Sequence, residues 1–370
     1  MKIQSFFYPL TFIVGVIFAL GMIGCNTDTS SSILFSREDF TVGQREVVYT
    51  HAQRNSRNLV WWPDGNMGVI NEGNGTYVFY AANSIQTVMT VGTLDEPAKY
   101  SSKDIRILNP KENSDYMSGG HIYLLDENTL LLFYHAEQYR DGYYRNFASM
   151  TGAAVSTTKD ENGRFIDFVD LGLIISSNRP FSNTSNRAMD MLGTASVLYN
   201  GYIYFYFRDY IDGVAWTINN LTVARASISD IRTAVNNGTA PVFLKYYNGG
   251  FSEPGLGGRS SPLENGNPGS SWLDISYNSY INKFIIAAIQ WQSPTDQYLY
   301  ITVSDDGINW SRRFLISDEA GEHFFSTIIG IGDDPQVTGK EFYIYYTHSI
   351  SGAWDRWSDA QLLRRKITLN

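Results

Sequence analysis

The chain has 370 residues, a formal net charge of −9, 43% hydrophobic residues and only 18% charged residues. This composition supports a large folded core and excludes general disorder. The acidic balance, without a basic tract, argues against nucleic acid as a partner. The single cysteine excludes an internal disulfide framework, a cysteine-rich zinc site and an iron–sulfur cluster.

Residues 1–24 have the pattern of a secretory signal, with a cationic start and a short apolar run. The run ends at Met22-Ile23-Gly24-Cys25, which resembles a bacterial lipobox. The resemblance implies cleavage before Cys25, lipidation of Cys25, and a bacterial cell-envelope protein that contacts the membrane through its lipid anchor only. A membrane-spanning anchor with an incidental cysteine is the alternative. We expect a flexible tether over residues 25–40 and a folded domain over residues 41–370.

Five similar units follow, each a short strand, a turn with Gly, Asn or Asp, and a strand rich in aromatic and β-branched residues. The units cover residues 67–84, 121–138, 195–210, 274–290 and 326–349. Such turns between two strands are typical of β-hairpins. A third strand follows each unit, at 87–94, 152–160, 221–229, 298–310 and 360–369. Radial repetition of such units predicts an all-β fold, the five-bladed β-propeller. A β-sandwich is the alternative, but it does not explain five matching units.

Two segments outside the repeats carry further predictions. Residues 46–52 precede the first unit and belong to none of the five. We expect them to pair with the last unit as its outermost strand, which closes the ring and covers two sheet edges. Residues 227–237 are the one segment with helical character.

The repeated unit, with Ser304-Asp305-Asp306-Gly307-Ile308-Asn309-Trp310 after its fourth copy, resembles the five-bladed propeller glycoside hydrolases of families 43, 32 and 117. Segment 304–310 also resembles a shortened sialidase Asp-box, in which Asp and Gly form a turn and Trp packs. The resemblance implies a glycoside hydrolase that acts on plant or algal oligosaccharides or polysaccharides in a pocket on the propeller axis. It also allows one Ca²⁺ or Na⁺ ion on the axis, near His323, while no zinc or EF-hand pattern indicates another metal or cofactor.

Glycoside hydrolysis needs two carboxyl groups in different environments. Asp64 resembles the family's blade-one aspartate and is our candidate base, with a turn aspartate before glycine as the alternative. The family's acid position, before the third unit, has no glutamate; Asp190 stands several residues early. Glu253, in the Gly-rich segment 247–262, or Glu137 is therefore our candidate acid.

Blade two departs from the family pattern because His121 stands where the family has an aspartate. His121, and Asp274 at the start of the fourth unit, are candidates for orienting or tuning the site, or are structural. Strand alternation places His135 and Glu137 on one side of their strand, as an acid–base couple or as an ion pair.

Substrate binding is expected from aromatic and basic side chains. Trp61 and Trp62 are candidates for stacking on a sugar ring, or belong to the core. Arg208 is a candidate for holding a substrate anion in a bidentate fork, or forms a surface pair with Asp209. Arg259, in the Gly-rich segment, is a further candidate. Two other functions stay open: a catalytically inactive glycan-binding lipoprotein, and a propeller that binds another protein by its rim.

Overall fold

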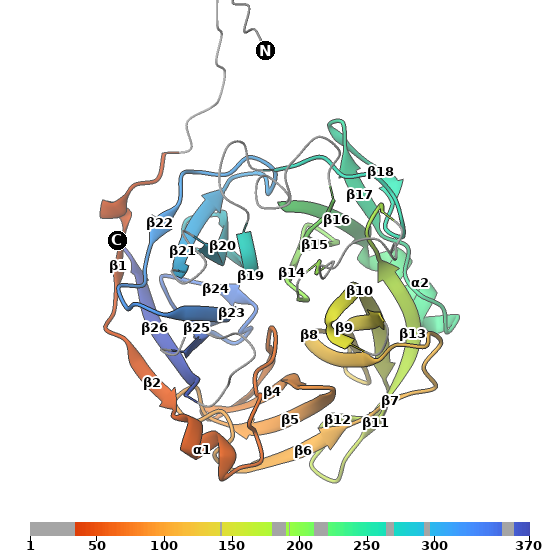
Figure 1. Ribbon diagram of the computed structural model, residues 1–370, viewed down its shortest axis with the longest axis horizontal. Helices are drawn as coiled ribbons and strands as arrows, with labels where there is room; N and C mark the ends of the chain where they lie inside the picture. Colours follow the sequence, from red (N-terminus) through yellow and green to blue (C-terminus); the bar gives the residue numbers. More distant parts are fainter. Residues whose placement is uncertain are drawn as a thin grey trace, which may run out of the picture. The chain divides into compact units, whose positions relative to one another are not determined.

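The computed structural model describes residues 34–140, 143–179, 190–191, 193–210, 221–263, 270–291, 297–349 and 359–370. Within this part of the chain, five sheets are arranged around one axis (Figure 1), which confirms the predicted five-bladed β-propeller. The expected signal segment and Cys25 lie outside the described residues. No described helix combines the length and the apolar character needed to cross a membrane.

Each blade is a meander of antiparallel strands in which the first strand lies nearest the axis (Figure 1). Blade one contains β3 (Gly68–Gly73), β4 (Thr76–Asn83), β5 (Gln86–Gly92) and β6 (Ser101–Ile105). Blade two contains β8 (Tyr116–Asp126), β9 (Thr129–Arg140), β10 (Tyr143–Ser156), β13 (Phe168–Ile175) and the short parallel edge strand β7 (Ile107–Leu108). Blade three contains β14 (Ser196–Tyr199), β15 (Tyr202–Arg208), β16 (Leu221–Ser227), β17 (Leu244–Tyr247) and β18 (Gly250–Pro254).

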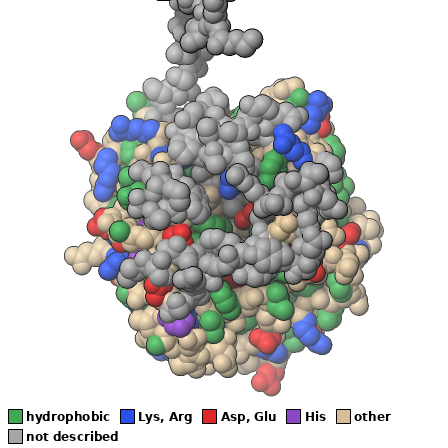
Figure 2. All heavy atoms as spheres, in the orientation of Figure 1, with side chains coloured by type: hydrophobic (Ala, Val, Ile, Leu, Met, Phe, Trp, Pro, Cys, Tyr) green, Lys and Arg blue, Asp and Glu red, His purple; other side chains and the backbone are tan. Residues whose placement is uncertain are grey.

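The last two blades follow the same order. Blade four contains β19 (Ser270–Asn278), β20 (Lys283–Trp291), β21 (Gln297–Ser304), β22 (Phe314–Leu315) and β24 (Val337–Thr338), which pairs in parallel with β19. Blade five contains β23 (Glu322–Gly330), β25 (Glu341–Ser349) and β26 (Gln361–Leu369). A small ribbon, β11 (Thr158–Lys159) and β12 (Phe165–Ile166), lies outside the blades. Figure 2 shows charged side chains of both signs around the outline of the propeller.

The ring is closed by the N-terminal part of the described chain. Strands β1 (Phe40–Val42) and β2 (Glu46–Tyr49) both pair with β26, the last strand of blade five. Glu46 lies opposite Arg364 and accepts a hydrogen bond of 2.7 Å from its Nε. The predicted closing strand is therefore confirmed.

Two boundaries near the start of the domain differ from the prediction. The expected strand 46–52 stops at Tyr49, because Thr50 and Gln53 form a capping box that starts helix α1 (His51–Asn55). The packed domain also begins before residue 41. Phe35 and Phe40 are buried, and both rings pack edge-on against Phe314, with centroid distances of 5.5 and 5.7 Å.

Two other segments, 227–237 and 247–262, contain regular secondary structure. Helix α2 (Ile228–Asn236) confirms the helical segment, and Ser227 caps its N-terminus by accepting a hydrogen bond from the Asp230 amide. The Gly-rich segment 247–262 begins as the turn between β17 and β18 and continues through β18.

Segment 304–310 has the structural role expected from its Asp-box resemblance. Asp306 Oδ1 accepts hydrogen bonds from the amides of Ile308 (2.8 Å) and Asn309 (2.7 Å), and Gly307 has a φ of 75°. Trp310 packs edge-on against Tyr206 at 5.8 Å. The segment therefore joins blade four to blade three and contributes no group to the pocket.

Apolar side chains fill the spaces between neighbouring blades. Five hydrophobic clusters are present among the described residues, and each joins two adjacent blades. Phe133 of blade two, for example, packs edge-on against Phe205 of blade three at 5.5 Å. The apolar core is therefore divided into these five interblade clusters, and none of them covers the axis.

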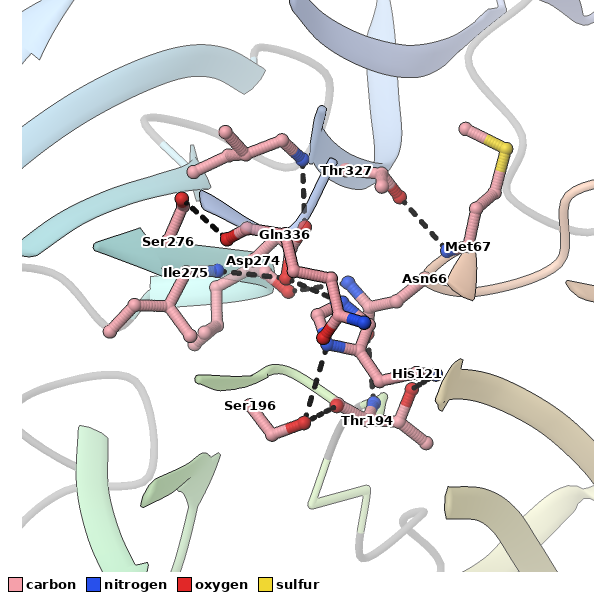
Figure 3. Close-up of polar contacts among 12 residues, drawn as sticks. Asn66, Met67, His121, Thr194, Ser196, Asp274, Ile275, Ser276, Thr327 and Gln336 are labelled. Carbon is pink, nitrogen blue, oxygen red and sulfur yellow. Dashed lines mark hydrogen bonds and ion pairs between the residues drawn. The ribbon is translucent and has the colours of Figure 1, made fainter. Parts of the chain in front are cut away.

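Polar side chains close the axis instead (Figure 3). The Asn66 amide group donates to the carbonyls of Leu273 (2.9 Å) and Ser326 (3.0 Å), and its Oδ1 accepts from the Thr194 amide (2.8 Å). One side chain of blade one thus joins blades three, four and five. Two glycines allow this close approach: a side chain on Gly120 would collide with Thr194, and one on Gly193 with Asn66.

We predict that Asn66→Ala lowers the free energy of unfolding by about 2–4 kcal/mol, because it leaves two buried carbonyls and one buried amide without their partner. Urea unfolding followed by fluorescence measures this loss. The matched control is Asn71→Ala, which removes two exposed hydrogen bonds, one to the Gly332 carbonyl of blade five and one from the Gly73 amide, and should cost less than about 1 kcal/mol. Equal losses in the two variants would contradict the importance of the axial contacts.

Candidate active site

A pocket of about 430 Å³ lies on the axis, with Asn66 and Thr194 among its lining residues. Its walls combine acidic and aromatic side chains. The acidic and histidine residues are Asp64, His135, Glu137 and Asp190, and the aromatic residues are Trp61, Tyr116, Tyr139, Phe147, Trp272, Phe324 and Phe325. Such a mixture of apolar walls and a few polar groups is typical of a small-molecule site.

Asp64 is held just before β3, where its amide donates to the Ala82 carbonyl at 2.9 Å. Its Oδ2 accepts a hydrogen bond of 3.3 Å from the Tyr116 hydroxyl. Burial and the negative charge of Glu137 raise the pKa of Asp64 to about 7, against smaller lowering effects of His135 and Tyr116. This carboxyl therefore keeps its proton to a higher pH than an exposed aspartate does.

Glu137 and His135 both line the pocket, as the alternation along β9 predicts. His135 Nε2 lies 3.1 Å from Glu137 Oε1, and the Tyr139 hydroxyl hydrogen-bonds to the same carboxylate. The ring of Tyr116 packs edge-on against His135 at 5.7 Å. This geometry fits both interpretations left open by the sequence, an acid–base couple and an ion pair.

Asp190 is the third carboxylate of the pocket. Ser149 Oγ donates to Asp190 Oδ1 at 3.1 Å and accepts from the Met191 amide at 2.7 Å, which fixes the carboxylate before β14. Burial lowers the pKa of Arg208 to about 10, and the negative charge of Asp190 opposes this shift. The sequence places Asp190 too early for the family's acid position, but the structure brings it into the pocket.

His121 and Asp274 lie below the pocket and do not line it. Their side chains form a buried pair, with 2.9 Å between His121 Nε2 and Asp274 Oδ1. Asp274 also accepts hydrogen bonds from the amides of Ile275 (2.8 Å) and Ile328 (2.7 Å), and His121 Nδ1 lies 3.3 Å from Ser196 Oγ. The pair therefore joins blades two and four across the axis, beside Asn66 (Figure 3).

The axis does not fit the cation that the family resemblance allows. Both oxygens of Asp274 are already hydrogen-bonded, and Asn66 Oδ1 accepts from the Thr194 amide. His323, expected near such an ion, instead contacts Glu319, Tyr346 and His348 inside blade five. Within the described residues, no group of three His, Cys, Asp or Glu side chains is arranged to hold a metal ion.

The predicted tryptophans have separate positions. Trp61 lines the pocket, and its amide donates to Asn83 Oδ1 at 2.9 Å. Trp62 is fully buried and packs edge-on against Phe79 at 6.4 Å, so it belongs to the core.

The remaining candidates lie outside the pocket lining. Glu253 is on β18, the outermost strand of blade three, and pairs there with Arg259 at 2.6 Å. Arg208 lies beside Asp190, and its Nη1 is 3.4 Å from Ser271 Oγ. The structure thus does not bring the candidate acid Glu253 near Asp64.

Sequence reasoning missed several lining residues: Tyr116, Tyr139, Phe147, Trp272, Phe324 and Phe325. Their position in the chain could have identified most of them, since Tyr116, Trp272, Phe324 and Phe325 lie in the first strand of a blade. Aromatic residues are so frequent in this chain that residue type alone does not distinguish the pocket from the core.

No family model matches the sequence, and no curated protein matches it. Among solved structures, the fold is similar to an α-L-arabinofuranosidase from Lactobacillus brevis (11% identity, TM-score 0.50, 83% of this chain and 91% of that chain). It is also similar to an α-L-arabinanase from Cellvibrio cellulosa in complex with arabinohexaose (11%, 0.47, 80% and 90%). A third match is an exo-β-1,3-galactanase from Phanerochaete chrysosporium with β-1,3-galactotriose (10%, 0.47, 88% and 64%). The five-bladed propeller of this chain is thus similar in fold to the α-L-arabinofuranosidase.

The raised pKa of Asp64 predicts a pH-dependent difference between the protein and its Asp64→Asn variant. Between pH 4 and 7 the unfolded chain ionises Asp64 while the folded protein keeps it protonated, so the folded protein loses stability as the pH rises. We expect Asp64→Asn to remove this loss and to be more stable above pH 7 by up to about 4 kcal/mol. Urea unfolding at pH 4 and pH 8 measures the difference, with Asp333→Asn on the exposed surface as control. Equal pH dependence in all three proteins would contradict the assignment.

Proposed function

We propose that the protein is a glycoside hydrolase that acts on an oligosaccharide in the axial pocket. The observation that carries this proposal is the meeting of three carboxyl groups from three segments, Asp64, Glu137 and Asp190, in one aromatic pocket. Asp64 has a pKa raised to about 7, so this carboxyl is suited to donate a proton. Fold similarity alone does not carry the activity, because one fold supports many functions.

In the proposed reaction Asp64 is the general acid. Its proton passes to the glycosidic oxygen as the bond from that oxygen to the anomeric carbon breaks. This role differs from the base that the sequence suggests for Asp64. The reason is the surroundings of Asp64. Burial and the charge of Glu137 favour its protonated form, whereas a general base must be ionised.

Asp190 is the proposed general base. It takes a proton from the water that attacks the anomeric carbon. Ser149 orients the Asp190 carboxylate, and the Arg208 guanidinium lies beside it. Glu137, paired with His135, acts through its charge on Asp64 rather than on the substrate bond.

The substrate is proposed to be an oligosaccharide of the kind bound by the proteins of similar fold, so arabino- and galacto-oligosaccharides are the first to test. A lipid anchor at Cys25 stays part of the proposal and would place the enzyme at the cell envelope. The alternative of a rim-binding scaffold has less support, because it does not require three carboxyl groups to meet in a pocket.

We predict that Asp64→Asn lowers kcat on oligosaccharides by about 10²–10⁴, the usual contribution of a general acid. Aryl glycosides with a 2,4-dinitrophenyl leaving group need no proton, so the same variant should keep much of its activity on them. The pH profile of the unsubstituted protein should fall on the alkaline side with an apparent pKa near 7. Product release from both substrates gives these values.

Two controls make the test decisive. Glu253→Gln, far from the pocket, should leave kcat unchanged, and Asp190→Ala should lose activity on both substrates and regain part of it with azide. If Asp64→Asn loses activity on both the oligosaccharides and the 2,4-dinitrophenyl glycosides, Asp64 is the base rather than the acid. Absence of turnover by the unsubstituted protein, with saturable glycan binding, would favour the glycan-binding alternative.

A further inference from the structure

Two residues of the pocket have a backbone conformation that their side chains disfavour. Ten non-glycine residues in the described part of the chain have a positive φ, and eight of them are Asn, Asp or Ser, which tolerate the left-handed region. The two exceptions are Trp272, with a φ of 41°, and Phe325, with a φ of 51°. For bulky aromatic residues this conformation is strained, so their presence requires an explanation.

Trp272 and Phe325 occupy equivalent places in neighbouring blades. Each lies in a β-bulge of the first strand of its blade, where the register of β19 shifts between Ser271 and Asp274 and that of β23 shifts between Phe324 and Thr327. A bulge turns a side chain away from the direction that regular alternation would give it. Trp272 also packs against two of the hydrophobic clusters, whereas Phe325 is not among the residues of any of the five. Folding alone would therefore be satisfied by Asn or Gly at position 325.

Both strained residues line the axial pocket and contact each other there. Their ring centroids are 5.7 Å apart, and Phe324 lies 5.1 Å from Trp272 and 6.1 Å from Phe325. The carboxyl groups of the pocket, by contrast, come from blades one and two and from the segment before blade three. The part of the pocket from blades four and five is therefore aromatic without a carboxyl group, whereas in the rest carboxyl groups and aromatic residues lie together.

We propose that Trp272 and Phe325 form a stacking platform for the apolar C–H face of a sugar ring, whose hydroxyl groups then face Asp64, Glu137 and Asp190. The weakly positive C–H groups of a sugar suit the negative face of an aromatic ring. Hydroxyl groups suit carboxylates and tyrosine hydroxyls as hydrogen-bond partners. At Phe325 the strain persists because ligand binding, rather than folding, requires an aromatic ring there, while the Trp272 ring serves both the core and the ligand.

The identity of the ligand rests on the proposed function, but the role of the two aromatic residues can be tested separately. It predicts that binding and stability respond differently to the same substitution. An organic cation is the competing occupant, since aromatic rings and carboxylates also bind such groups. The test therefore includes both kinds of ligand.

The experiment measures binding by calorimetry in an Asp64→Asn background, where hydrolysis is suppressed. The probes are arabino-, xylo- and galacto-oligosaccharides and, separately, tetramethylammonium. Phe325→Asn should weaken binding of the oligosaccharide at least tenfold, while the melting temperature without ligand stays equal or rises. Phe325→Leu keeps apolar volume without an aromatic face, and it should also weaken binding.

The matched control is Asn74→Phe, which places the same aromatic residue at a left-handed turn position (φ 53°) between β3 and β4. It should lower the melting temperature and leave binding unchanged. Unchanged affinity in both Phe325 variants, a large fall in the melting temperature of Phe325→Asn, or binding of tetramethylammonium in place of every oligosaccharide would overturn the platform. If the protein binds a glycan through Phe325 but hydrolyses none, the hydrolase proposal fails and the platform stands.

Discussion

The closure of the axis by polar side chains is the constraint on which the rest of the structure depends. The apolar clusters lie between neighbouring blades, so none of them can cover the centre, where the first strands bring backbone groups together. Asn66 satisfies groups of three other blades, and His121 with Asp274 joins the remaining one. Buried polar groups must find such partners, because leaving them unpaired costs more than the hydrogen bonds contribute.

The axial closure also determines the chemistry of the pocket above it. Asp64 lies two residues before Asn66, so the contacts that hold Asn66 also hold Asp64 in a partly buried position near Glu137. Burial and a neighbouring negative charge together keep a proton on this carboxyl at a pH where an exposed aspartate would have lost it. Structural and chemical roles are thus divided between adjacent residues of one short segment.

Local patterns in the sequence were sufficient for the architecture. Two aromatic or β-branched strands around a Gly, Asn or Asp turn form a hairpin through nearby contacts, and five such units have few arrangements other than a propeller. The strand that closes the ring was predictable because β2 belongs to no blade, but helix α1 was missed although Thr50 and Gln53 form a local capping box.

The site shows where sequence reasoning ends. The sequence by itself determined the five blades and the closing strand, which follow from the repeated units, and the candidacy of His135 and Glu137, which follows from alternation along one strand. The candidacy of Asp64 followed from the family resemblance. Only the tertiary structure decided that Asp190 joins them, that Glu253 pairs with Arg259 on an outer strand, and that His121 and Asp274 bind each other. The physical reason is that the pocket forms where five strands distant in the chain converge, and bulges in the first strands of blades two, four and five reorient side chains there by amounts that alternation does not predict.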